Sequence, residues 1–144
     1  MAIGLVILVG IIGGVAVGLQ TPFSSFIGQR VGANASSFII HFSGAILSAL
    51  FLFVNGGEKI SNWRALPWYV VFVGIFGVIL FQTINVTMPR LGTAMSIALI
   101  IIGQLTIGIL IDHFGLLGAT SRPIDLTKVL GVVALFIGGY LIAK

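Results

Sequence analysis

Polar side chains recur within long apolar stretches of this chain, at spacings that place them on shared helix faces. Gln20 and Ser24 are four residues apart, and Gln82 and Asn85 are three apart, so each pair would share one face of a helix. Amide, hydroxyl and imidazole groups can bind a polar or zwitterionic solute without burying a full charge. The residues predicted to line such a site are Gln20, Ser24, His41, Gln82, Asn85, Ser96 and Gln104.

Two of these residues receive more specific hypotheses. Gln104 is expected near the centre of its stretch, beside Gly103, which allows close approach of another helix. His41 is the one titratable side chain placed well inside a stretch, and it could carry a proton or act as a neutral hydrogen-bonding residue. The alternative for all the amides is that they bond helices together, at about 1 kcal/mol or less each.

Several kinds of chemistry are not indicated. The chain has no cysteine, no histidine-rich metal motif, no nucleophile elbow and no phosphate-binding loop, so we predict no enzyme activity, no metal and no cofactor. The first three apolar stretches hold no Asp or Glu, the usual proton and cation carriers of transporters. The 7 Lys and Arg residues are scattered singly, which argues against binding nucleic acid despite a pI near 10.2.

The composition indicates that lipid surrounds the elements carrying these side chains. Of the 144 residues, 58% are hydrophobic and 7% are charged, and the mean hydropathy is +1.24. A soluble domain carries about 25% charged residues because it must cover its surface with polar groups. This chain cannot do so, and a lipid bilayer removes the need.

A bilayer core of about 30 Å requires about 20 mostly apolar residues per helix. We therefore predict an all-α polytopic membrane protein, a bundle of five transmembrane helices forming a single domain over residues 1–144. Pro22 predicts a kink or an early end of the first helix, Asn34 is a candidate cap for the second, and Pro89 is expected to close the third. The predicted spans are residues 3–26, 36–54, 68–86, 93–111 and 126–143.

Glycines and helix ends add two expectations, and no internal sequence repeat is apparent. Gly10, Gly14 and Gly18 recur every fourth residue and form a groove for helix packing, which by itself identifies no activity. Asp112 and His113 follow the fourth predicted span. They are expected to form an interfacial pair or a gate.

Five spans would place the two termini on opposite sides of the membrane. The N-terminal side would then hold Lys59, Arg64, Arg122 and Lys128, and the other side Arg30, Arg90 and Lys144, a tally of 4 against 3. The positive-inside rule needs a clear excess to fix orientation. Two possibilities follow: the chain inserts both ways and forms an antiparallel homodimer, or it inserts one way, with or without a paralogous partner chain.

The residues from Gly103 to Leu105 and from Leu110 to Gly118 carry a family resemblance. Together with Pro89–Ala94 and Gly18-Leu19-Gln20, they resemble the YdcZ-type family of small bacterial inner-membrane proteins, within the drug/metabolite transporter superfamily. The resemblance implies five helices, equal to half of a ten-helix member, and pairing of such halves, often in opposite orientations. Relatives often have Asn where this chain has Ser24.

The expected function combines the residues with this resemblance. It is a small-solute exporter or exchanger in a bacterial inner membrane, working by alternating access as an antiparallel dimer, so that two copies build an inverted repeat. The expected partners are the lipid bilayer, a small-molecule solute, and a second copy or a paralogous chain. The alternative is a non-transporting membrane subunit or assembly factor.

Overall fold

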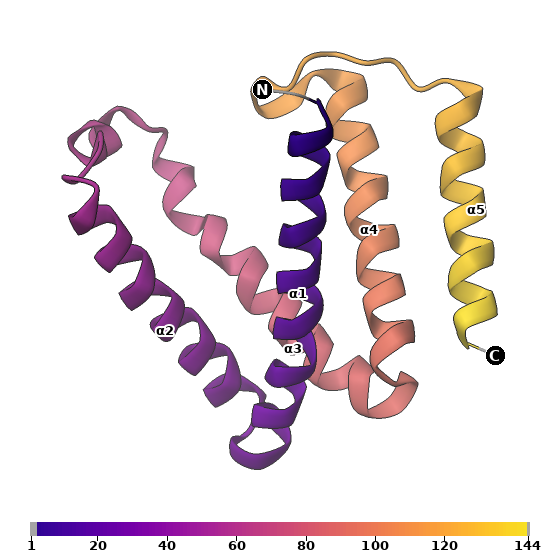
Figure 1. Cartoon of the computed structure of the whole chain (residues 1–144), viewed down its shortest axis with the longest axis horizontal. Helices are drawn as coiled ribbons and strands as arrows, with labels where there is room; N and C mark the ends of the chain where they lie inside the picture. The colour runs from indigo at the N-terminus through magenta and orange to yellow at the C-terminus, as the bar shows by residue number, and fades with distance from the viewer. Residues whose placement is uncertain (1–2, 144) are drawn as a thin grey trace. The chain divides into compact units, whose positions relative to one another are not determined.

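The computed structural model describes residues 3–143, which form helices with no β-strand among them. The main helices, drawn in Figure 1, are α1 (Ile3–Val31), α2 (Ala33–Val54), α3 (Gly74–Leu91), α4 (Thr93–Phe114) and α5 (Leu126–Ala143). Three short 3₁₀ helices lie in the connections: η1 (Ile60–Ala65), η2 (Trp68–Val73) and η3 (Leu116–Gly118).

Four helical segments of the described chain are long and apolar enough to cross a bilayer. They are α1 with 29 residues, α2 with 22, the continuous segment Trp68–Leu91 with 24, and α4 with 22. At about 1.5 Å per residue, each exceeds the roughly 30 Å of a hydrocarbon core. The helix α5 is apolar but shorter. The prediction of an all-α, multi-pass membrane protein is confirmed, and crossing by α5 stays a prediction.

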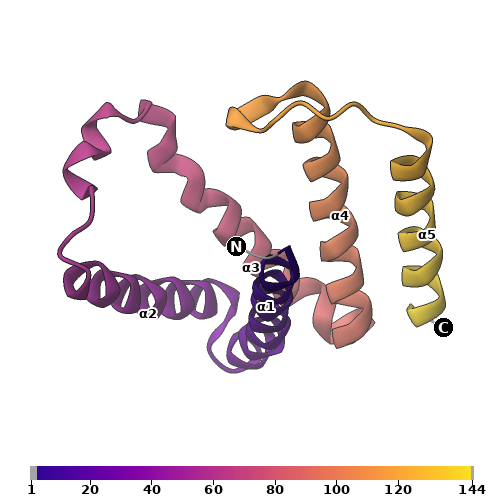
Figure 2. The same cartoon turned by 45° about the horizontal axis from the view of Figure 1, so that its top comes forward.

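The chain divides into two compact units, Met1–Val86 and Thr87–Lys144, called here the N-terminal and C-terminal units. In the N-terminal unit, α1 and α2 meet at Gly32 and diverge away from it, as Figures 1 and 2 both show. In the C-terminal unit, α4 and α5 pack side by side.

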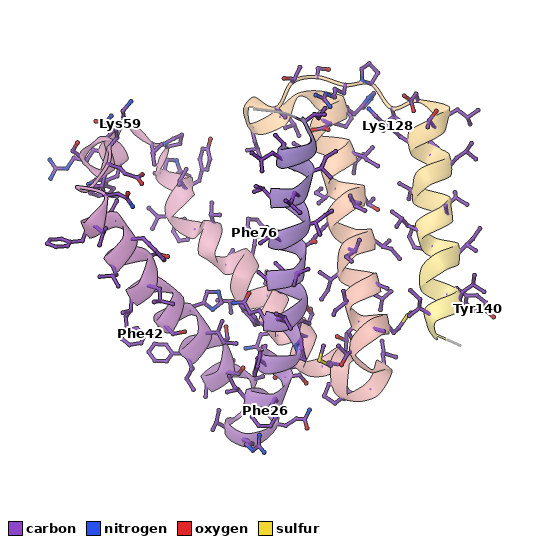
Figure 3. The ribbon with its side chains drawn as sticks, viewed as in Figure 1. Phe26, Phe42, Lys59, Phe76, Lys128 and Tyr140 are labelled. Carbon is purple, nitrogen blue, oxygen red and sulfur yellow. The ribbon has the colours of Figure 1, made fainter. Side chains whose placement is uncertain are left out.

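Burial in this chain is inverted relative to a soluble protein. Among the described residues, the buried apolar side chains are Phe81, Ile84, Met88 and Ile102. The buried polar ones are more numerous: Thr21, Ser24, Ser25, Ser36, Ser37 and Ser96. Lipid tails are as apolar as leucine, so small hydroxyl side chains can occupy the contacts between helices while large apolar side chains face outward. Ser24 and Ser36 bond to each other across helices, whereas Thr21 and Ser96 bond to carbonyls four residues earlier. Phe42 and Tyr140 project outward in this way in Figure 3.

Two of the 4 prolines, Pro22 and Pro89, lie inside helices, which corrects two predicted boundaries. The first helix runs to Val31 rather than ending near residue 26, with Pro22 inside it, and α3 continues past Pro89 to Leu91. An interior proline costs about 3 kcal/mol, whereas ending a helix leaves four carbonyls without partners, each costing several kcal/mol in lipid. Continuing the helix through the proline therefore costs less free energy than ending it within the lipid. The fourth helix likewise extends past residue 111 to Phe114.

The prediction that Asn34 caps the second helix is wrong. The helix begins at Ala33, and its N-cap is Gly32, which makes no side-chain capping bond. Asn34 lies in the first turn, where its Oδ1 accepts a hydrogen bond from Gln82 on α3. The Asn34 side chain therefore joins α2 to α3 and does not cap its own helix.

The two turns that begin α2 and α4 share a sequence and a backbone geometry, so the chain does contain a short internal repeat. Residues 30–36 and 90–96 both read Arg, an aliphatic residue, Gly, three residues, Ser. Gly32 has φ 92° and ψ 152°, and Gly92 has φ 79° and ψ 171°, a backbone region that is essentially restricted to glycine. Each glycine is the single residue that joins two helices.

Candidate functional site

The most completely buried polar contact lies where α1, α2 and α3 meet. Ser24 and Ser36 are each 0% exposed, and the Ser36 hydroxyl donates to the Ser24 carbonyl oxygen at 2.8 Å. The two hydroxyl oxygens are 3.4 Å apart, and Asn85 Nδ2 donates to Ser24 Oγ at 3.4 Å. Asn85 Nδ2 also donates to the Phe81 carbonyl at 2.7 Å. We call Ser24, Ser36 and Asn85 the serine cluster.

Glycine at position 28 makes this approach possible. A Cβ atom added to Gly28 would overlap Asn85 Oδ1, so α3 reaches α1 only where a side chain is missing. Gly28 lies one helical turn after Ser24 and therefore on the same face of α1. The serine cluster and Gly28 together fix the position of α3 against α1.

A second polar seam joins α2 to α3. Gln82 Nε2 donates to Asn34 Oδ1 at 2.5 Å. Further along α2, the His41 ring packs perpendicular to Phe81, with 5.1 Å between centroids, and its Nε2 lies beside Gly77. Asn34 and His41 are two helical turns apart and so share one face of α2. We call Asn34, His41 and Gln82 the polar edge.

Exposure separates the serine cluster from the polar edge. The hydroxyls of Ser24 and Ser36 are sealed, so no solute reaches them in this conformation. His41 and Gln82 are half-buried, and Asn34 is exposed. The polar edge can thus present amide and imidazole groups to a solute, while the serine cluster holds the three helices that carry that edge.

The structure brings together four of the seven predicted site residues. Ser24 and Asn85 are directly bonded, and His41 and Gln82 lie on the adjoining seam. Gln20 is exposed on α1 and lies outside this group. The remaining two belong to the C-terminal unit: Ser96 is buried and donates to the Gly92 carbonyl at 2.8 Å, and Gln104 is exposed on α4.

Three residues of these contacts are not among the site residues predicted from the sequence: Asn34, Ser36 and Gly28. The signal for Asn34 was present, because Asn34, Ser37 and His41 follow the spacing of one helix face, to which Ser36 does not belong. The second span was started at residue 36, so that Asn34 was interpreted as a cap. Gly28 carried no periodic signal of its own, since its role depends on a contact from α3.

The predicted helix-packing glycines have no neighbour in the described chain. Nothing lies within 4 Å of a Cβ atom built at Gly10, Gly14 or Gly18. The groove they form on α1 is therefore open in one copy of the protein, and its packing against another helix stays a prediction.

Asp112 and His113 lie at the end of α4, where they organise the connection to α5. Arg122 N donates to the Asp112 carbonyl at 2.8 Å, and Ile124 N donates to His113 Nδ1 at 3.1 Å. The Ser121 hydroxyl donates to the His113 carbonyl at 3.3 Å. These bonds fold the connection back onto the helix end, and the gate stays a prediction.

Comparison with known proteins adds the identity of the family. Residues 5–141 match the family described as "Putative inner membrane exporter, YdcZ". The chain belongs to the YdcZ family. Its membership extends over nearly the whole chain, so both units and all five helices fall within the family's pattern. No curated protein and no solved structure matches the chain.

Family membership sets the class of the protein. The family is one of membrane exporters, which are transporters rather than enzymes, and the four long apolar helices agree with a multi-pass membrane protein. Amide and imidazole groups, such as those of the polar edge, match a neutral polar or zwitterionic solute.

Proposed function

We propose that this YdcZ-family protein is half of a small-solute exporter or exchanger that works by alternating access as an antiparallel dimer. The observation that carries the proposal is the polar edge of Asn34, His41 and Gln82, held beside a sealed serine cluster at the meeting point of three spans. Polar groups within membrane helices are costly, and they mark solute and ion pathways more often than not.

The polar edge suits solute binding because its groups retain hydrogen-bonding capacity. Gln82 uses one amide hydrogen on Asn34, which leaves its carbonyl oxygen and second amide hydrogen for a solute. The Asn34 amide nitrogen and His41 Nε2 are likewise free of hydrogen-bonded partners among the described residues. A neutral or zwitterionic solute would meet donors and acceptors without a compensating charge.

The proposed dimer is supported by apolar side chains at the start of α1 that remain exposed in a single copy of the chain. Leu5, Val6, Ile7 and Leu8 are all about half exposed, although four consecutive residues point to every side of a helix. Within the N-terminal unit, the first turns of α1 therefore have no covering neighbour on any face, and both lipid and a second copy can cover them. With α5 as the fifth span, a second copy in the opposite orientation would complete an inverted repeat.

Transport can be tested without knowing the substrate. Purified protein would be placed in liposomes loaded with a defined mixture of neutral amino acids and sugars, and efflux would be followed by mass spectrometry. We expect at least one solute to leave faster than from protein-free liposomes. Gln82→Ala removes one or two hydrogen bonds to the solute and should slow that efflux about three- to tenfold.

Ser43→Ala is the matched control. Ser43 is an exposed polar residue on α2 whose hydroxyl donates only to its own helix, to the Ile40 carbonyl, so its loss should leave efflux unchanged. If the protein is folded and assembled but no solute leaves faster than from protein-free liposomes, the proposed transport function is wrong. That result would favour a non-transporting membrane subunit.

A further inference from the structure

The hydrogen bond made by His41 fixes which of its two nitrogens carries the proton. Nδ1 lies 2.7 Å from the Ser37 carbonyl oxygen, and a carbonyl only accepts hydrogen bonds. Nδ1 must therefore carry a hydrogen. The perpendicular Phe81 ring, itself buried, holds the imidazole in this orientation. In the neutral ring the lone pair then belongs to Nε2.

The second nitrogen is unoccupied and reachable. Nε2 has no hydrogen-bond partner among the described residues and lies beside Gly77, where an added Cβ would come within 2.5 Å of it. Every buried side-chain nitrogen or oxygen of the described chain does have a partner. Nε2 is therefore not sealed, and a small donor can approach it.

His41 lies at membrane depth without a competing ionisable group. It is eight residues into α2, about 12 Å from the start of the helix at 1.5 Å per residue. The elements packed against it, α1 and α3, carry one charged residue each, Arg30 and Arg90, both in a last turn. The ionisable groups Glu58, Lys59, Arg64 and Tyr69 lie in or beside the connection from α2 to α3.

We propose that His41 Nε2 is a proton-binding site inside the membrane, and that its protonation drives the exporter. The Nε2 lone pair takes a proton from water on one side to give an imidazolium with both nitrogens protonated. It returns the proton to water on the other side and becomes neutral again. The site rests on geometry alone, whereas the coupling to export rests on the proposed function.

The proton site can be tested directly because the chain has 2 histidines in opposite tautomers. His113 Nδ1 accepts a hydrogen bond from Ile124 N, so its neutral ring carries hydrogen on Nε2, the reverse of His41. Histidine labelled with ¹⁵N would give resolved signals for both rings in lipid nanodiscs. His113→Gln would assign them by removing one set.

As the buffer is changed from alkaline to acidic pH, the expected result is a His41 ring that carries hydrogen on Nδ1 alone at first and on both nitrogens at the end. A ring carrying hydrogen on Nε2 at high pH, or one that does not change over this range, overturns the proton site. Gly77→Val serves as a second variant, because a side chain beside Nε2 should displace the ring and alter its titration while α3 remains helical by circular dichroism.

Coupling is measured in the same liposomes with and without an acidic exterior. His41→Gln keeps a donor for the Ser37 carbonyl but cannot take up a proton, so it should remove the acceleration by the gradient while Ser43→Ala retains it. Equal acceleration in His41→Gln overturns the coupling. A normal ¹⁵N titration with no efflux from any variant would instead contradict the proposed transport and leave the proton site standing.

Discussion

A serine hydroxyl between membrane helices contributes through size as well as through hydrogen bonding. Ser24 and Ser36 let α1 and α2 approach closely because each side chain is barely larger than alanine, and each hydroxyl has a partner. An unpaired hydroxyl would be costly there, since no water reaches it. Asn85 adds the third helix to the same pair of residues.

Removing one member of the serine cluster should weaken the fold modestly. Ser36→Ala deletes two interhelical contacts to Ser24 and Asn85→Ala deletes one, and such bonds average about 0.6 kcal/mol in membrane proteins, with a maximum of about 1.7. The free energy of unfolding would be measured by SDS titration in mixed micelles. Ser43→Ala, which has no interhelical bond, should change it less, and an equal loss would contradict the assignment.

Gly28 should tolerate substitution far less than the other glycines of α1. In Gly28→Ala the new methyl group overlaps Asn85 Oδ1, so the Asn85 amide must turn away, or α3 must move, and the bond from Asn85 to Ser24 is lost. We expect a loss of about 1–3 kcal/mol, as for overpacking of a well-packed contact. Gly18→Ala meets nothing within 4 Å and improves helix propensity, so the same unfolding assay should show no loss.

The sequence identified the residues of the site better than their partners. Ser24, His41, Gln82 and Asn85 were predictable because a polar side chain in an apolar stretch is conspicuous and spacing assigns it to a helix face. The bond from Ser36 to Ser24 was not predictable. It depends on the register of α1 against α2, which the geometry of Gly32 fixes and single-helix periodicity does not contain.

At the scale of helices, starting points were easier to predict than ends. The starts at Trp68, Thr93 and Leu126 agree with the sequence, and so does the end of α2 at Val54 before the Asn-Gly-Gly turn. Prolines misled the prediction because rules for proline reflect helices in water. In lipid, the helix that continues through Pro22 keeps more backbone groups paired than one that stops.

The repeated turns give a test of how tightly the helices are joined. Gly32→Ala and Gly92→Ala place a Cβ on a backbone region that is essentially restricted to glycine, at about 1–3 kcal/mol each. Both should lower the thermal midpoint of unfolding in detergent. Gly44→Ala is the control, because Gly44 is helical with open space around it, and it should stabilise or have no effect. Equal thermal midpoints for all three variants would contradict the requirement for glycine at the two repeated turns.

At the scale of the whole molecule, one chain leaves the groove of Gly10, Gly14 and Gly18 uncovered. If another helix packs there, Gly14→Leu should weaken association without weakening the fold of the chain, because nothing in the described N-terminal unit lies within 4 Å of a Cβ atom built at Gly14. Crosslinking in membranes and unfolding in detergent would measure the two separately. Unchanged association would show that the groove faces lipid only, whereas loss of the fold would show that Gly14 packs within the chain.

The orientation of the chain in the membrane distinguishes an antiparallel homodimer from an assembly in which every copy has the same orientation. It can be measured by cysteine labelling because the sequence has 0 cysteines of its own. One cysteine near each terminus in turn would be labelled in intact cells with an impermeant reagent. With positive charges at 4 against 3, we expect both termini to be labelled in similar fractions. Labelling of one terminus alone would rule out the antiparallel homodimer and leave a parallel assembly or a paralogous partner.

Charge variants then test whether the nearly equal numbers of positive charges on the two sides cause the chain to insert in both orientations. Ser61→Lys adds a charge to the connection that already holds Lys59 and Arg64, which changes the tally from 4 against 3 to 5 against 3. We expect this variant to adopt one orientation and, as the only copy in the cell, to lose efflux. Adding Arg64→Gln to the Ser61→Lys protein returns the tally to 4 against 3 in the same connection. This double variant should again be labelled at both termini and should recover efflux. Efflux that persists in a fully oriented Ser61→Lys protein would contradict the antiparallel dimer, because transport would then require no inverted copy.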